Sequence, residues 1–515
     1  MRRKTKWVHA AVLAAGFLGA SSTVVARPAV VSSLAAAHAQ APAAIAVSKQ
    51  VSASKIADAD LNPEAGSGYT AKQVVHARHF MMATANPHAT EAGYEVLRHG
   101  GSALDAAIAA QMVLTLVEPQ SSGIGGGAFI VYYDKAHKKL TTYDGRETAP
   151  AAATPNRFMA NGKPLPFWTS VNSGLSVGVP GVLRALELAH RQYGKLPWAD
   201  LFKPAIRLAD EGFRVSPRLH AMLVKSSELS RQKAAAAYFL DADGKPWPAG
   251  HLLKNPALAE VLRRVAQRGA DAFYTGDIAH DIVAAVRGHA IPGDMTLADL
   301  AHYRARQREP LCGDYRAYRI CGMAPPSSGT LGVLELLGVL EYVPMNKLKP
   351  EGLEAVHYFS EAGRLAYADR DYYAADPDFI KMPTQALISP AYLKSRFSLI
   401  SPDRSMGVAK PGDPVGKLAE LGRDNAPEIP STSQIVAVDA SGDVVSMTTT
   451  IESAFGSKLF VRGFMLNNQL TDFSRDPVDA SGKPVANRVQ PNKRPRSTMA
   501  PIIVFHNQEP YMALG

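Results

Sequence analysis

The stretch IPSTSQIVAVD, from Ile429 to Asp439, decides how the rest of the chain is interpreted. The residues before it, GRDNAPEIP (422–430), are rich in proline and acidic side chains, which is typical of a loop. After Ser431 and Thr432 the apolar residues alternate, which predicts a strand, and VVSMTTT (444–450) predicts its hairpin partner. A Ser–Thr pair therefore stands at the very start of a strand, late in the chain.

A threonine in this position can have a chemical role. Its hydroxyl is a weak nucleophile unless a base lies beside it, and one solution makes the threonine the first residue of a chain, so that its own α-amine takes the proton. This requires a peptide bond cut before the threonine, a loose segment upstream and a rigid strand downstream. Thr432 meets these requirements, but ordinary turn residues also occupy strand starts, so spacing alone leaves both interpretations open.

Composition excludes several classes of protein. The 515 residues are 46% hydrophobic and 20% charged, which is enough to bury a sizeable core in two or three domains or in one large one. The formal charge is +10, but beyond the first six residues Lys and Arg are scattered without a polybasic run. We therefore expect a solvated basic surface and no nucleic-acid partner.

The N-terminus has the pattern of an export signal. MRRKTK is followed by a short apolar run and by AHAQ, whose small residues suit cleavage before Gln40, so residues 1–39 are predicted to be a signal peptide and 40–74 a flexible linker. The apolar run is too short for a membrane span, and we expect a periplasmic or secreted protein. In such a compartment Cys312 and Cys321 could form a disulfide, but two buried thiols remain equally open.

The order of predicted elements indicates an α+β fold. Ser102 caps a helix over 103–117, with Asp105 at the capping-box position, and a strand follows at 128–134. A long stretch that looks like an exposed linker covers about 400–430. Further helices are predicted at 90–99, 181–194, 197–212, 256–270 and 352–373, and further strands at 434–440, 464–469, 500–505 and 511–515.

The run Gly123, Gly125, Gly126 and Gly127 invites a nucleotide-binding interpretation, but the order of elements argues against it. A phosphate-binding turn runs from strand through glycines to helix, whereas here the glycines lead from a helix to a strand. We expect these glycines either to pack tightly beside a core strand or to frame a pocket. No metal-binding pattern is evident either, and we predict no metal and no cofactor.

The chain resembles the gamma-glutamyltranspeptidases from about residue 75 to its end. The resemblance is carried by GIGGGAFIVYYD, DGRETAPAAAT, PPSSGT, YADRDYYAADPDF, FMLNNQLTDFS and PNKRPRSTMAP, in that order. It implies a four-layer αββα sandwich of the N-terminal-nucleophile hydrolase type. It also implies that the precursor cleaves itself into a large subunit, 75–431, and a small subunit, 432–515.

The same resemblance implies roles for individual residues. Thr432 is the nucleophile, the bond between Ser431 and Thr432 is cleaved, and Thr450 orients the nucleophile. The residues expected to bind the glutamyl group are Arg146 for the α-carboxylate, Glu452 with Asp472 for the ammonium, and the hydroxyl pair Ser497 and Thr498 for the carboxylate. The planar fork of arginine suits a carboxylate, so elementary chemistry agrees with the first of these roles.

The implied reaction moves a γ-glutamyl group from glutathione or a related compound to water, an amino acid or a peptide. Two alternatives stay open: a glutaryl or β-lactam side-chain acylase of the same fold, which would not need the Glu452–Asp472 pair, and a relative that does not mature. The balance of hydrolysis and transfer, the acceptor and the oligomeric state are not specified by these residues.

The chain departs from the family pattern in three places. Gln434 stands where relatives usually have a histidine, and the loop 474–490 looks shorter than a lid-bearing loop, which would leave a more open pocket. The sequence stops at Gly515, before the Gly-Gly turn whose N–H groups form the oxyanion hole in relatives. We therefore expect an incomplete copy of the small subunit.

Overall fold

The computed structural model describes residues 73–515, except 417–419, 425 and 428–430. The predicted signal peptide and nearly all of the predicted linker at 40–74 lie outside the described residues. Within the described part of the chain, no helix is long and apolar enough to cross a membrane.

The strand predicted after Thr432 is part of a six-stranded antiparallel sheet. The sheet has the order β1 (Met81–Thr84), β11 (Ser433–Val438), β12 (Val444–Thr450), β2 (Gly127–Asp134), β3 (Lys139–Gly145) and β8 (Arg306–Arg308). The predicted hairpin is confirmed, with Ser433 opposite Thr449. On its other side β12 pairs with β2, and this register sets Thr450 opposite Gly127.

A second sheet packs on the first. It has four antiparallel strands in the order β16 (Glu509–Leu514), β15 (Ile502–His506), β10 (Tyr318–Gly322) and β9 (Leu311–Tyr315). Apolar side chains from both sheets form one buried cluster between them. The cluster contains Val131, Tyr133, Val436 and Val444 from the first sheet and Cys321, Ile503, Phe505 and Ala513 from the second.

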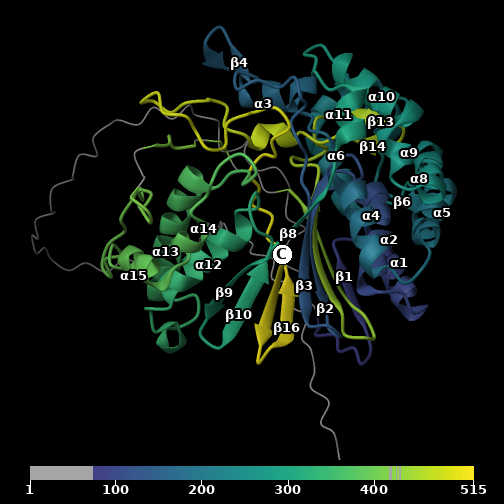
Figure 1. Cartoon of the computed structure of the whole chain (residues 1–515). Coiled ribbons are helices and arrows are strands. Elements are labelled where there is room, and N and C mark those ends of the chain that lie inside the picture. The colour runs from purple at the N-terminus through teal and green to yellow at the C-terminus, as the bar shows by residue number, and fades with distance from the viewer. Residues whose placement is uncertain (1–72, 417–419, 425, 428–430) are drawn as a thin grey trace, which may run out of the picture. The chain divides into compact units, whose positions relative to one another are not determined.

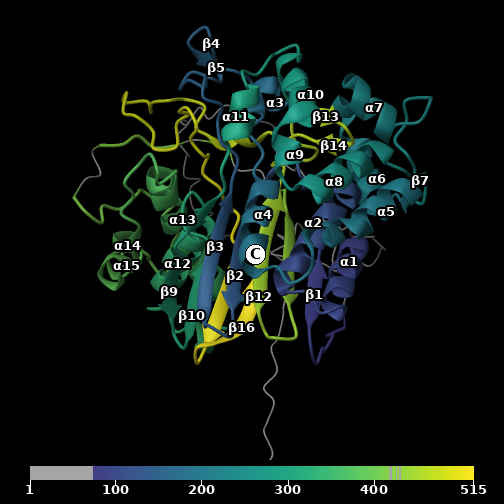
Figure 2. The same ribbon diagram turned by 45° about the vertical axis from the view of Figure 1, so that its right-hand side comes forward.

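Helices cover the other face of the six-stranded sheet (Figure 1). They include α1 (Pro87–Arg98), α2 (Ala103–Val117), α4 (Val182–Tyr193), α5 (Lys203–Glu211) and α8 (Pro256–Arg268). Every residue of α2 is buried, and the predicted capping box is confirmed: the Ser102 hydroxyl accepts from the Asp105 N–H, and the Asp105 carboxylate accepts from the Ser102 N–H. Figure 2 shows α4 lying across the face formed by β2 and β3.

A second group of helices packs against the four-stranded sheet. It includes α12 (Gly329–Leu340), α13 (Leu353–Tyr373) and α15 (Pro390–Phe397). The described part of the predicted linker beyond α15 has no helix or strand, and about half of its residues are exposed. It is nevertheless attached to α13, because Glu361 accepts from the Met406 N–H at 2.7 Å and Asp369 accepts from the Gly412 N–H at 2.6 Å.

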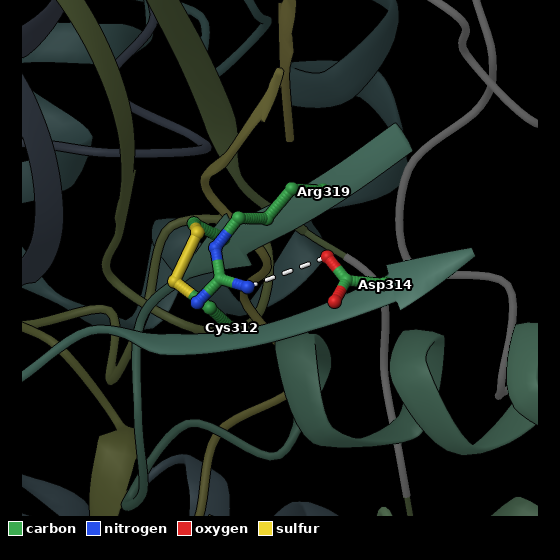
Figure 3. Close-up of a disulfide and its surroundings, with 4 residues drawn as sticks. Cys312, Asp314 and Arg319 are labelled. Atoms are coloured by element: carbon green, nitrogen blue, oxygen red, sulfur yellow. Dashed lines mark hydrogen bonds and ion pairs between the residues drawn. A yellow bond between two sulfur atoms is a disulfide. The ribbon is translucent and has the colours of Figure 1, made fainter. Parts of the chain in front are cut away.

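The two cysteines form a disulfide between β9 and β10, which settles the question that the sequence left open. Figure 3 shows Arg319 beside this disulfide, with its guanidinium directed to Asp314 on the neighbouring strand. The two charged groups are 3.3 Å apart and exposed. The disulfide therefore joins the two strands of a hairpin at the rim of the contact between the sheets.

The structure differs from the sequence predictions in three places. Residues 306–322, outside the predicted strands, supply three strands, and only Phe464–Met465 (β14) of the strand predicted at 464–469 is formed. The physical reason for the second difference is that Asn467 donates to the carbonyls of Gly125 and Gly178, which draws the chain away from a strand. The predicted helix at 197–212 begins instead as a 3₁₀ turn, Trp198–Phe202.

The remaining elements are short and connect these layers. The helices are α3 (Phe167–Val171), α6 (Pro217–Lys225), α7 (Lys233–Phe239), α9 (Asp271–Tyr274), α10 (Gly276–Arg287), α11 (Leu297–His302) and α14 (Thr384–Leu387). The strands are β4 (Met159–Ala160), β5 (Lys163–Pro164), β6 (Phe213–Arg214), β7 (Leu252–Leu253) and β13 (Phe460–Val461).

Candidate active site

Thr432 is exposed and immediately precedes β11, while Ser431 before it is buried. The side chain that reaches this peptide comes from the last residue of β12. The hydroxyl of Thr450 donates to the carbonyl oxygen of Ser431 at 2.9 Å and accepts from the backbone N–H of Glu452 at 2.8 Å. One buried hydroxyl thus joins the carbonyl of the Ser431–Thr432 bond to the residue predicted to bind an ammonium group.

The glycine run before β2 serves both roles that the sequence left open. A Cβ on Gly126 would lie 2.0 Å from the carbonyl oxygen of Thr450, and a Cβ on Gly127 would lie 2.3 Å from the carboxylate of Glu147. The backbone of Thr450 leaves no room for a Cβ at residue 126, and a Cβ at residue 127 would displace the buried carboxylate of Glu147, so both glycines allow close packing. The residues that they approach belong to the candidate site, so they also frame it.

Arg146 follows β3 directly and is almost fully buried, with 1% of its side chain exposed. Its Nε donates to the carbonyl oxygen of Pro495 at 3.2 Å, and its Nη2 donates to that of Arg496 at 2.7 Å and also to the carboxylate of Asp472. The guanidinium therefore links β3 to two segments that follow more than 320 residues later in the chain.

A surrounding network fixes the backbone of Arg146. The carboxylate of Asp144 accepts from the Arg146 N–H at 2.8 Å and from the Nε of Arg308 at 2.7 Å. The Tyr303 hydroxyl donates to the carbonyl oxygen of Arg146 at 2.7 Å. Charge-assisted hydrogen bonds such as that from Arg308 to Asp144 are about twice as strong as neutral ones, so the backbone at Arg146 is held firmly.

Glu452 and Asp472 form the expected carboxyl pair. The Nδ2 of Asn468 donates to Glu452 at 2.6 Å, and the Nε2 of Gln469 donates to Asp472 at 3.1 Å. Burial, and then the neighbouring charge of Asp472, hold the pKa of Glu452 well above its ordinary value. A proton on Glu452 relieves the repulsion between the two carboxyl groups, and a ligand ammonium could take the place of that proton.

The hydroxyl pair lies on the segment that Arg146 contacts. The Oγ of Ser497 accepts from the Met499 N–H at 3.2 Å, and its carbonyl oxygen accepts from the N–H of Ser328 at 2.7 Å. Thr498 is exposed, and its hydroxyl accepts from the Nη2 of Arg370 at 2.9 Å. Both hydroxyl residues therefore follow directly after the carbonyls that Arg146 binds, and Arg370 contacts the second of them.

Gln434, one of the departures from the family pattern, lies on the sheet and bonds along it. Its side chain donates to the Ser446 hydroxyl at 2.8 Å and accepts from the Thr448 hydroxyl at 2.6 Å. These bonds tie β11 to β12, so the glutamine contributes to the strand that carries Thr432.

Sequence reasoning missed Glu147. Its carboxylate is fully buried, 3.8 Å from the Nη1 of Arg146, and neither of its oxygens has a hydrogen-bond partner. Burial raises its pKa to about 8, against the opposing effect of Arg146. The signal that could have identified it is its position beside Arg146 in DGRETAP, where two opposite charges interrupt a buried segment.

The described part of the chain has an open cleft of about 950 Å³, and Asp371, Asp424, Ser474 and Asp476 contribute to its walls. The predicted site residues do not line this cleft, although Ser474 is only two residues along the chain from Asp472. Among the described residues, no group of three or more His, Cys, Asp or Glu side chains is arranged to hold a metal ion.

Comparisons with known proteins identify similar chains over most of the sequence. The family model described as gamma-glutamyltranspeptidase matches residues 89–515. The glutathione hydrolase proenzymes of Bacillus subtilis strain 168 and Escherichia coli K12 are 39% and 36% identical to the chain, over 86% of it in each case. These alignments cover 76% and 75% of the relatives, so the chain spans about three quarters of their length.

Acylases are also among the similar proteins. The Acylase ACY 1 proenzyme of Pseudomonas sp. SE83 is 32% identical over 84% of the chain and 76% of that protein. A cephalosporin acylase from Bacillus halodurans superposes with a TM-score of 0.75 at 29% identity, covering 88% of this chain and 80% of that one. The Helicobacter pylori gamma-glutamyltranspeptidase gives 0.64 at 33% identity, covering 68% and 99%.

Proposed function

Because this chain belongs to the gamma-glutamyltranspeptidase family, we propose that it is a γ-glutamyl hydrolase and transferase that matures by cutting its own chain before Thr432. Its mixed α and β structure matches the N-terminal-nucleophile hydrolases, and the two packed sheets with helices outside support the finer description as a four-layer αββα sandwich. The substrates are glutathione and related γ-glutamyl compounds.

Maturation begins at the Ser431–Thr432 bond. The Thr432 hydroxyl attacks the carbonyl carbon of Ser431, its proton passes to the Thr432 nitrogen as the C–N bond breaks, and the acyl group of Ser431 is left on the hydroxyl oxygen as an ester. Water hydrolyses this ester, which leaves a carboxylate on Ser431 and a free α-amine on Thr432. The Thr450 hydroxyl supports the first step, because it already donates to the oxygen on which negative charge develops.

Arg146 and the carboxyl pair bind the two ends of the glutamyl group. Arg146 binds the α-carboxylate, assisted by the hydroxyls of Ser497 and Thr498, and Glu452 with Asp472 binds the α-ammonium. Arg146 and Asp472 pair with each other, so a zwitterionic ligand would exchange one internal ion pair for two external ones. Such a clamp contributes mainly by orienting the γ-carbonyl toward the nucleophile.

Catalysis then has two halves. The Thr432 hydroxyl, whose proton passes to the α-amine of the same residue, attacks the γ-carbonyl and forms a γ-glutamyl ester while the amine is released with a proton. Water or the amino group of an amino acid or peptide attacks the ester in the second half and restores the threonine hydroxyl. No cofactor takes part in either half.

The observation that carries this proposal is the Thr450 hydroxyl bond, because it connects the carbonyl of the bond to be cut with the backbone of Glu452. The test is N-terminal sequencing and intact mass of the purified protein, with Thr432→Ala as the matched control. We expect a small subunit beginning Thr432-Ser433-Gln434 in the wild type alone. A wild-type chain that stays whole would show that this form does not mature.

A second candidate, a glutaryl or β-lactam side-chain acylase, is favoured by the acylase relatives. A glutaryl substrate lacks the α-ammonium group, so it gives the pair Glu452 and Asp472 no ligand. Turnover of γ-glutamyl-p-nitroanilide and of its des-amino analogue glutaryl-p-nitroanilide distinguishes the two activities. We expect the γ-glutamyl compound to be preferred, and equal turnover would favour the acylase.

We also propose that the mature protein is periplasmic or secreted and consists of a large subunit ending at Ser431 and a small subunit beginning at Thr432. The basic and apolar pattern of residues 1–39 supports export. Fractionation of expressing cells tests this proposal, because removal of the segment before Gln40 in the exported fraction is the expected result.

A further inference from the structure

The loop from Glu452 to Lys458 has an unusual backbone. Four of its seven residues lie in the left-handed region: Glu452, Phe455, Gly456 and Lys458, with φ values of 76°, 61°, 52° and 67°. Residues other than glycine rarely adopt this conformation, and they keep it only where their surroundings enforce it. Three such residues in one short loop therefore require specific interactions that hold them.

Lys458 supplies one of these interactions from inside the loop. Its side chain is buried, with 6% of the residue exposed, and its ammonium donates to the carbonyl oxygens of Ala454 at 2.6 Å and Gly456 at 3.0 Å. Its own N–H donates to the Phe455 carbonyl at 3.0 Å. A buried ammonium group needs such acceptors, and in return it fixes carbonyls that the left-handed turns point inward.

The loop transmits this constraint to Glu452 through Asn468. The Oδ1 of Asn468 accepts from the N–H and the hydroxyl of Ser453, both at 3.0 Å, and its Nδ2 donates to Glu452 at 2.6 Å. The Phe455 N–H is held by the carbonyl of Gln120 at 2.8 Å. The direction of the Glu452 carboxyl group therefore depends on the path of the residues that Lys458 ties together.

The charges of Lys458 and Glu452 also interact. Burial lowers the pKa of Lys458 to about 8, while the charges of Glu452 and of Glu228 act in the opposite direction. A cation in this position favours the ionised form of Glu452, which is the form that binds an ammonium group.

We propose that Lys458 is a positioning residue for the ammonium end of the substrate: its buried side chain locks the left-handed loop that aims Glu452 at Asp472. This inference rests on the proposed γ-glutamyl activity and adds a specificity role for a residue outside the site itself. It predicts that the loss of Lys458 weakens binding of the α-ammonium group and leaves the binding of the rest of the substrate unchanged.

The test compares γ-glutamyl-p-nitroanilide with glutaryl-p-nitroanilide, which lacks only that group. In Lys458→Met we expect the KM for the γ-glutamyl compound to rise about tenfold to a hundredfold, as for the loss of a hydrogen bond to a charged group. The kinetics of the glutaryl compound should be unchanged. Lys458→Gln keeps a neutral donor for the carbonyls and should lie between Lys458→Met and the wild type.

A control variant separates this role from general destabilisation. Val265→Ala opens a cavity in α8, and we expect it to lower the melting temperature without changing the ratio of the two KM values. If Lys458→Met impairs maturation, the same comparison is made by binding: L-glutamate and glutarate are added to Thr432→Ala with and without Lys458→Met, and the shift in melting temperature is measured. Only the shift with glutamate should be lost.

The possible outcomes separate the proposed function from the proposed role of Lys458. A wild type that does not discriminate between the compounds would refute the ammonium site, and with it the role of Lys458. The other outcome is a wild type that prefers the γ-glutamyl compound and a Lys458→Met variant whose KM changes equally for both compounds or for neither. That result would overturn the role of Lys458 and leave the proposed function intact.

Discussion

Replacing Thr450 by valine tests how the chain cuts itself. Valine has nearly the same shape as threonine and fills the same buried space, but it has no hydroxyl to donate to the Ser431 carbonyl, now 2.9 Å away. When the Thr432 hydroxyl attacks, negative charge develops on that carbonyl oxygen. The Thr450 hydroxyl is therefore a donor placed in advance at an oxyanion.

The expected magnitude follows from this role. Removing a single donor to an oxyanion costs about 10²–10³ in rate, or about 2.7–4 kcal/mol in the barrier. The same substitution leaves the N–H of Glu452 without its acceptor, which costs about 1–3 kcal/mol of stability where the group is buried. The first effect slows cleavage, while the second lowers the melting temperature, so the two are measured separately.

The assay follows conversion of the full-length chain into two fragments on denaturing gels after synthesis is stopped. We expect Thr450→Val to slow this conversion by the stated factor, and Thr450→Ser, which keeps the hydroxyl, to remain within a few fold of the wild type. Equal cleavage rates for Thr450→Val and the wild type, with both chains folded, would refute the assignment of Thr450 as an oxyanion donor.

Three further predictions concern the buried charges and the disulfide. Arg146→Lys keeps the charge but cannot reproduce the fork that contacts Pro495 and Asp472, so we expect kcat/KM for γ-glutamyl-p-nitroanilide to fall about tenfold to a hundredfold, mostly through KM. Because burial raises the pKa of Glu147 to about 8, the folded state keeps a proton that the unfolded chain releases near pH 4.5. The free energy of unfolding should therefore fall as pH rises from 4.5 to 8, by at most about 5 kcal/mol. Glu147→Gln should remove this dependence, which urea unfolding curves at several pH values measure. Replacing both Cys312 and Cys321 by serine should lower the free energy of unfolding by about 2–3 kcal/mol, given a sequence separation of 9 residues, and chemical denaturation of the two forms measures it.

Elements whose causes are local were predictable from the sequence. The helix at 103–117 is specified by its own cap and by apolar residues on every side, and the structure buries all of it. The hairpin of β11 and β12 was visible because alternation and a turn are short-range signals. The position of Thr432 at the start of β11 follows directly from that hairpin.

Elements whose causes are distant were not predictable in the same way. The strands between 306 and 322 are short and mixed in polarity, and they become strands because β3 and β15 supply their partners. The segment after Met465 has the apolar character of a strand, but Asn467 binds two carbonyls from other parts of the chain. In both cases tertiary contacts decide the outcome, and a single sequence does not display them.

The site shows the same division at the level of single residues. The family resemblance implied that Arg146 and Asp472 bind the same glutamyl group, but only the structure shows that the two side chains contact each other across 326 residues. Glu147 and Lys458 were missed because DGRETAP and SAFGSKLF mix charged, polar and apolar residues, so the sequence does not show that either side chain is buried. The structure buries both of them, and burying a charge is costly unless other interactions offset the loss of hydration. A buried charge is therefore itself evidence of a role: Glu147 follows Arg146 directly, Lys458 closes the loop that begins at Glu452, and both Arg146 and Glu452 are predicted to bind an end of the glutamyl group.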